Sequence, residues 1–141
     1  MIMQEELLSY AQKINFPSQA ENIHLVEKLV DEVCDELNVQ EDNYGNILIA
    51  LTEAVNNAIH HGNKLDATKQ TYVSCTTEEH KITFKVKDEG LGFNFYNLPD
   101  PTSPENIENP NGRGIFLMKN LADEINFDDE GRIVELTFHI L

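Results

Sequence analysis

The spacing of apolar residues switches along this chain from the period of a strand to the period of a helix, and that switch most constrains its fold. Apolar side chains alternate with polar ones over residues 8–16, up to Pro17, which predicts a half-buried strand. Residues 23–37 and 42–61 then carry apolar side chains three and four positions apart, as amphipathic helices do. We therefore expect one strand followed by two long helices.

Local signals predict where these helices begin and end. Ser18 and Glu21 have the spacing of a capping box, in which the serine side chain closes the start of the first helix. Gly62 follows the second helix at the place of a C-terminal cap. Each helix is thus expected to have one end stabilised by its own neighbouring residues.

The second half of the chain predicts hairpins and one more helix. The expected elements are a hairpin (72–76 and 81–87), a short helix (114–122) and a closing hairpin (124–127 and 132–140). Residues 94–111 contain four of the five prolines and no sustained period. An irregular connection of this length is usually either a functional lid or disordered, and we favour a lid.

This order of elements predicts the α+β class. The expected architecture is a two-layer α/β sandwich, with helices covering one face of a mixed, mostly antiparallel sheet. A length of 141 residues suits one domain, residues 1–141. The chain has neither the GxGxxG turn of a Rossmann site nor the GxxxxGK[ST] loop of a Walker site. Any nucleotide would therefore have to bind in another way.

Acidic residues dominate the charge. The chain has 25 Asp and Glu against 10 Lys and Arg, a formal net charge of -15, which disfavours direct binding of nucleic acid. Residues 1–63 hold 11 of the acids and 2 of the bases, which predicts an acidic surface for a basic partner. No apolar run could span a bilayer and no signal peptide is visible, so we expect a soluble cytoplasmic protein without membrane contact. Cys34 and Cys75 lack metal-ligand spacing and are expected to be buried thiols.

Three segments hold residues that could carry chemistry, and the first is the end of the second helix. Glu53, Asn57 and His60 fall on one helical face. Asparagine disfavours helix interiors, so the pair Asn56 and Asn57 indicates that its amides are used. A carboxylate one turn from a carboxamide can supply a base beside a hard cation such as Mg²⁺. The alternatives are a solvated polar face or a metal hydrolase, although the HExxH spacing is absent.

The second segment is a glycine-containing turn at the end of the strand 81–87. Gly90 and Gly92 would let the backbone approach a flat ligand closely. Asp88 accepts hydrogen bonds only and would suit an exocyclic amine. The alternative is a simple turn, which is common where strands end.

The third segment, residues 111–119, opens the short helix and contains Gly112, Arg113, Gly114 and Ile115. Helix N-termini present unpaired N–H groups and bind anions, although an ordinary loop-to-helix junction has the same composition. Taken together, the three segments describe an ATP site. The net negative charge opposes a polyanion, so phosphates would rely on Mg²⁺, backbone N–H groups, Arg113 and Lys119.

The order and spacing of these segments resemble the N, G1 and G2 boxes of the histidine-kinase-like ATPases. The matching runs are Glu53-x-x-x-Asn57-Ala58 with His61-Gly62, Asp88-x-Gly90-x-Gly92-Phe93, and Gly112-Arg113-Gly114-Ile115. The length and the closing hairpin are similar to the stand-alone branch, the anti-sigma factor serine-protein kinases. The resemblance covers about residues 7–140.

The resemblance implies a Bergerat-type ATP fold and a role for each matching residue. Asn57 would be the Mg²⁺ ligand, Glu53 the base that activates a protein serine, and Asp88 the reader of the adenine amine. The residues lining the nucleotide would be Gly90, Gly92, Gly112, Arg113, Gly114 and Ile115. In the position where the family often has threonines after the glycine of the last hairpin, this chain has Arg132 and Ile133.

The function implied by the resemblance is an ATP- and Mg²⁺-dependent serine-protein kinase that acts as an anti-sigma factor and partner-switching regulator. The expected partners are a sigma factor and an anti-anti-sigma (STAS-type) protein, with the kinase itself a homodimer. Two alternatives stay open. One is an ATP-binding regulatory module without phosphotransfer, and the other is an interaction domain that needs no nucleotide.

Overall fold

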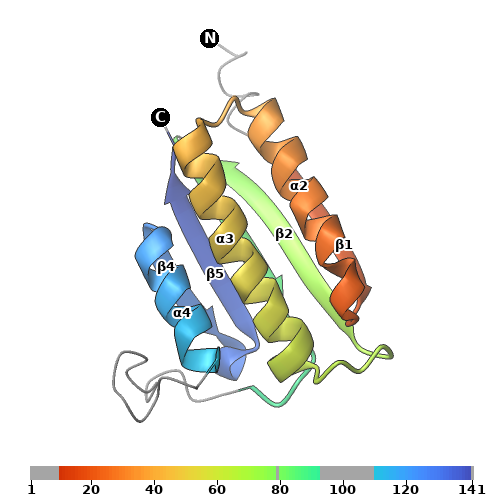
Figure 1. Ribbon diagram of the computed structural model, residues 1–141. Helices are drawn as coiled ribbons and strands as arrows, with labels where there is room; N and C mark the ends of the chain where they lie inside the picture. The colour runs from red at the N-terminus through yellow and green to blue at the C-terminus, as the bar shows by residue number, and fades with distance from the viewer. Residues whose placement is uncertain (1–9, 79, 93–109, 141) are drawn as a thin grey trace.

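The computed structural model describes residues 10–78, 80–92 and 110–140, and of residues 110–113 the backbone alone. These residues form an α+β sandwich with three helices on one face of a five-stranded sheet (Figure 1). The strands are β1 (Ala11–Pro17), β2 (Gln70–Glu78), β3 (Lys81–Lys87), β4 (Glu124–Asp128) and β5 (Ile133–His139). The helices are α2 (Ile23–Glu36), α3 (Glu41–Asn57) and α4 (Pro110–Leu121). The predicted class and order of elements are therefore confirmed.

The sheet has the order β1-β2-β3-β5-β4, and every strand pair in the described residues is antiparallel. Alternation along β3 places Ile82, Phe84 and Val86 on the helix-covered face, where all three are buried. Phe84 meets Phe138 of β5 edge to face, with ring centroids 6.2 Å apart and an interplanar angle of 77°. The inner face of the sheet thus forms one side of the core.

The helices close the other side of the core with the apolar stripes that their sequences predict. The buried residues of α2 are Val26, Leu29, Val30, Val33 and Cys34, and those of α3 are Ile47, Ala50, Leu51, Ala54 and Val55. The second thiol, Cys75 of β2, is also buried. No helix in the described ranges is both long and apolar enough to cross a membrane.

The predicted capping box before the first helix is wrong. The chain leaves β1 through a 3₁₀ turn, Ala20–Asn22, so α2 starts only at Ile23, and neither helical segment has a side-chain cap. Ser18 lies too far upstream to close α2. It is fully buried instead, and its Oγ donates to the carbonyl of Lys69, 2.8 Å away.

The predicted cap at Gly62 is also wrong. The last turn of the second helix widens into a π turn, Ala58–Gly62, and Asn63 occupies the C-cap position. Gly62 does not adopt the positive φ that an αL cap requires. The close approach of the Asp88 side chain explains why a glycine stands here.

The third helix begins earlier than its sequence indicates. It starts at Pro110, inside the range predicted for the lid and four residues before the predicted start. Proline suits the first turn of a helix because it has no N–H group to leave unpaired. The rest of the predicted lid, residues 94–109, lies outside the described residues.

Candidate functional site

Glu53 and Asn57 lie one turn apart near the end of α3, and both face the start of α4. A Cβ atom built on Gly114 would lie 3.2 Å from Glu53 Oε2, 3.1 Å from Asn57 Nδ2 and 3.4 Å from Asn57 Oδ1. Both side chains are half-buried. The third predicted member of this face, His60, lies in the π turn and is exposed. The structure thus brings the Glu53 carboxylate and the Asn57 carboxamide together against Gly114, which has no side chain.

Asp88 follows directly after β3 and is 8% exposed. Its Oδ1 accepts a hydrogen bond from the N–H of Gly90 at 2.8 Å, and its own N–H donates to the carbonyl of Arg132 at 3.0 Å. Among the described residues, Oδ2 has no hydrogen-bond donor. Burial raises the pKa of Asp88, while the Gly90 N–H group and the charges of Arg132 and Lys69 oppose that rise.

The glycines around Asp88 are required by close contacts. A Cβ atom on Gly62 would lie 2.4 Å from the carboxylate of Asp88, and one on Gly90 would lie 2.0 Å from the carbonyl oxygen of Gly62. Gly92 has φ +81°, and a Cβ there would lie 2.2 Å from the carbonyl oxygen of Glu130. The turn after β3 is therefore held against the end of the second helix and against the β4–β5 connection, with no room for side chains.

Asn63 is a buried polar residue for which the sequence analysis predicted no role. Its amide donates to Ser18 Oγ (2.7 Å) and to the carbonyl of Gln70 (2.9 Å). Its Oδ1 accepts from the N–H of Glu89 at 2.7 Å. Asn63 thus joins the end of β1, the start of β2 and the exit of β3. The only local signal was a polar residue directly after the glycine of the helix end.

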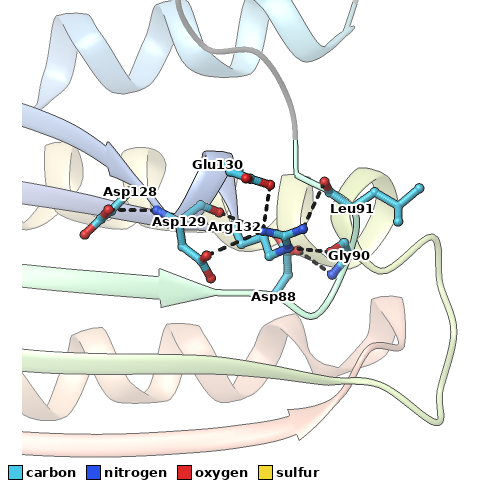
Figure 2. A network of polar contacts seen from close by, with 7 residues as sticks. All are labelled: Asp88, Gly90, Leu91, Asp128, Asp129, Glu130 and Arg132. Carbon is cyan, nitrogen blue, oxygen red and sulfur yellow. Dashed lines mark hydrogen bonds and ion pairs between the residues drawn. The ribbon is translucent and has the colours of Figure 1, made fainter.

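Arg132, directly before β5, is the second residue without a predicted role. Figure 2 shows its guanidinium between the turn after β3 and the connection from β4 to β5. Nε donates to the carbonyl of Gly90 at 2.7 Å and Nη2 to the carbonyl of Leu91 at 3.3 Å. Nη1 donates to the carbonyl of Asp129 at 3.2 Å and lies 3.3 Å from Glu130 Oε2.

The earlier start of α4 changes which N–H groups are free at its N-terminus. The first four N–H positions of a helix have no intrahelical acceptor. With the helix beginning at Pro110, the first turn includes Gly112, whereas Gly114 and Ile115 lie beyond it. The Ile115 side chain is 6% exposed and packs in the core. The free N–H groups of α4 therefore lie about one turn nearer the start of the helix than predicted.

The described residues offer oxygen ligands without a preformed metal cage. No group of three His, Cys, Asp or Glu side chains among them is placed to hold a metal ion. This arrangement gives no support to metal-hydrolase chemistry at Glu53 and His60. Glu53 and Asn57 still present oxygen atoms of the type that Mg²⁺ prefers.

Sequence comparisons relate this chain to a known family of ATPases. The family model of the histidine kinase-like ATPase domain matches residues 16–138. The chain is 30% identical to the serine-protein kinase RsbW of Bacillus mycoides over 135 residues, which are 91% of this chain and 84% of that protein. It is 28% identical to the anti-sigma F factor of Bacillus subtilis over 134 residues, 90% of each chain.

A solved structure supports the fold. The crystal structure of the RsbU and RsbW domains of a Mycobacterium tuberculosis protein superposes with a TM-score of 0.68 at 17% identity. The match covers 93% of this chain, which spans about a third of that longer protein (32%). This chain belongs to the histidine-kinase-like ATPase family and, within it, to the anti-sigma factor serine-protein kinases.

Proposed function

We propose that this chain is an ATP- and Mg²⁺-dependent serine-protein kinase that acts as an anti-sigma factor and phosphorylates a STAS-type anti-anti-sigma protein. The convergence of Glu53 and Asn57 on the backbone of Gly114 carries the proposal. A base and an oxygen ligand side by side, against a helix that has no side chain at Gly114, suit the transfer of a phosphoryl group, because this reaction depends mainly on positioning and on charge neutralisation.

Adenine recognition is proposed for the turn after β3. The close packing of Gly62 and Gly90 holds the Asp88 carboxylate in place, and its Oδ2 is left without a hydrogen-bond donor among the described residues. Asp88 Oδ2 would accept a hydrogen bond from the exocyclic amine, because Oδ1 is already engaged by Gly90. Recognition of the adenine ring by Asp88 is therefore separate from the proton transfer proposed for Glu53.

The side-chain oxygen atoms of Glu53 and Asn57 on α3 suit a magnesium ion. Mg²⁺ is commonly held by one or two protein oxygens together with substrate phosphates and water, so no cage of several carboxylates is required. Asn57 Oδ1 would hold the ion, which when bound would offset the phosphate charge in a protein of net charge -15. Gly112 would add the free N–H of the first helical turn, with Arg113 and Lys119 as nearby cations in the sequence.

Glu53 is proposed as the general base. Its carboxylate lies beside Asn57 and is not engaged by any hydrogen-bond donor within the described residues. It would accept the proton of the substrate serine hydroxyl as that oxygen attacks phosphorus. Glu53→Gln should therefore keep nucleotide binding and abolish transfer, whereas Asp88→Asn should weaken binding itself.

The proposed partners are a sigma factor and a STAS-type protein. The names of two relatives, a serine-protein kinase and an anti-sigma factor, support this proposal. Acidic side chains on α2 and at the start of α3 line a groove of about 660 Å³, among them Asp31, Glu32, Asp35 and Glu41. A basic segment of a sigma factor would complement this charge. A complex with a sigma factor that is insensitive to salt would contradict this proposed charge complementarity.

We also propose that the protein forms a homodimer and lies in the cytoplasm.

The kinase proposal is tested by incubating the chain with γ-labelled ATP, Mg²⁺ and the STAS-type proteins of the same genome. We expect labelled phosphoserine with the wild-type chain and with the control Glu27→Gln, an exposed acid of α2, and none with Glu53→Gln. Nucleotide binding is measured separately as thermal stabilisation by Mg-ADP, which reaches about 2.7 kcal/mol at 100 times Kd. Binding without phosphoserine on any of the STAS-type proteins would favour the non-catalytic module. No stabilisation at all would favour the nucleotide-independent domain.

A further inference from the structure

One guanidinium group joins the two segments that flank Asp88. Arg132 donates to the carbonyls of Gly90 and Leu91 on one side and to the carbonyl of Asp129 on the other (Figure 2). A neutral side chain of similar length offers at most two donors on one nitrogen, whereas arginine presents five in a planar fork. The fork can therefore fix both carbonyls of the turn at the same time.

The clamped turn contains the atoms that shape the surroundings of Asp88. Gly90 supplies the N–H group that binds Asp88 Oδ1, and its carbonyl oxygen is the acceptor for Arg132 Nε. The backbone N–H of Asp88 in turn donates to the carbonyl of Arg132. Movement of the Arg132 side chain would thus release the peptide that orients the carboxylate.

Charge gives Arg132 a second effect on the same carboxylate. Burial disfavours the ionised form of Asp88 and raises its pKa, and the nearby Asp129 acts in the same direction. Arg132 and Lys69 are the cations that oppose these effects. The Arg132 side chain is 26% exposed, so its interaction with Asp88 is only partly screened by solvent.

We propose that Arg132 is a positioning residue for nucleotide recognition: it holds the turn at Gly90 and Leu91 so that an ionised Asp88 meets the adenine amine. The inference rests on the proposed function, because it concerns the same nucleotide site. Arg132 itself makes no contact with the base in this scheme. It acts through the backbone of the turn and through its charge.

The test compares ADP with IDP, whose base carries a carbonyl in place of the exocyclic amine. Calorimetric titrations with Mg²⁺ from pH 5 to pH 8 give the affinity ratio and its pH midpoint for the wild-type chain, Arg132→Gln and Arg132→Lys. For Arg132→Gln we expect the preference for ADP over IDP to fall roughly tenfold, the size of losing one hydrogen bond to a charged group. The midpoint below which ADP affinity falls should move to higher pH. Arg132→Lys should keep the wild-type midpoint and lose part of the preference.

The matched control is Lys85→Gln, which removes the same charge from the neighbouring strand. Lys85 of β3 pairs with Glu135 of β5 at 3.8 Å on the exposed surface, so both the ratio and the midpoint should stay at wild-type values. A purely structural role for Arg132 would lower the affinities for ADP and IDP equally, without moving the midpoint, and would overturn the inference.

The outcomes separate this inference from the proposed function. If the wild-type chain prefers ADP and both Arg132 variants keep its ratio and midpoint, the inference fails and the proposed function stands. If the wild-type chain binds neither nucleotide, or binds both equally, the proposed adenine site fails and the inference falls with it. If Arg132→Gln does not fold, an unchanged ratio in folded Arg132→Lys overturns the inference.

Discussion

Replacing Gly114 with alanine should stabilise the fold and impair the proposed phosphotransfer. Gly114 lies inside α4 without a positive φ, so alanine fits the helical backbone there. The added methyl group would lie 3.1 Å from Asn57 Nδ2 and 3.2 Å from Glu53 Oε2. These distances are tighter than ordinary contacts between such atoms, so both side chains must move by a few tenths of an ångström.

The expected gain in stability and the expected loss of phosphotransfer rate can each be estimated. Alanine in place of glycine inside a helix contributes about 1 kcal/mol, which for a domain of this size raises Tm by about 3 °C. Crowding against Glu53 and Asn57 should cancel part of that gain. Misplacing reacting groups by 1 Å costs about 100-fold in rate, so a shift of a few tenths should lower phosphotransfer roughly five- to tenfold.

Gly45→Ala is the matched control. Gly45 lies inside α3, and no atom would come within 4 Å of its added Cβ. We expect the full gain of about 1 kcal/mol in unfolding free energy and an unchanged rate of transfer. Unfolding free energy is measured by urea denaturation, and transfer by the rate of phosphoserine formation.

A wild-type rate of phosphate transfer by Gly114→Ala, in an assay where Glu53→Gln is inactive, would contradict this prediction. The positions of Glu53 and Asn57 against α4 would then not govern the reaction. A loss of stability in Gly114→Ala, with Gly45→Ala stabilised as expected, would show that the methyl group is accommodated by separating α3 from α4.

Three further results are expected. Asn63→Ala should lower the unfolding free energy by about 3 kcal/mol, because it leaves the N–H of Glu89 and other buried polar groups unpaired; a change below 0.5 kcal/mol in urea denaturation would contradict the role of Asn63. Because the pKa of Asp88 is raised on folding, stability falls as the pH rises through the window between its unfolded and folded values. Asp88→Asn should therefore be neutral or stabilising at pH 7 in thermal melts, and a large loss of stability would refute this. Burial raises the pKa of Cys34 to about 11 and that of Cys75 to about 12, so maleimide at pH 7.5 should label both thiols in urea and neither in the folded chain, as mass spectrometry would show.

The helices and hairpins were predictable because their signals are local. The stripes of α2 and α3 and the alternation of β3 each lie within one segment, and burial of one face selects the same period that the sequence contains. The candidate residues Glu53, Asn57 and Asp88 were also found from the sequence, since residues at α-helical spacing face one direction and a strand end has a defined place. Their mutual arrangement with Gly114 depends on how α4 packs against α3, which no local pattern encodes.

The two wrong capping predictions share one cause. Ser18 and Gly62 have the sequence signals of helix ends, yet Ser18 binds Lys69 across 51 positions of the chain and Gly62 packs against Asp88. A capping signal in the sequence shows only that a residue is able to cap the neighbouring helix. In the folded protein, Ser18 and Gly62 make contacts with distant segments instead.

By itself, the sequence determined the α+β class, the order of elements and the family, because the spacing of apolar residues and of glycines is visible in the sequence without knowledge of long-range contacts. Tertiary structure alone decided the roles of Asn63 and Arg132. Both residues bind backbone groups of segments distant in the chain, Asn63 at the exit of β3 and Arg132 at Gly90 and Leu91. Every residue has a peptide carbonyl group and every residue except proline has a peptide N–H group, so the type of a residue does not reveal which backbone group will bind Asn63 or Arg132 until folding brings the segments together.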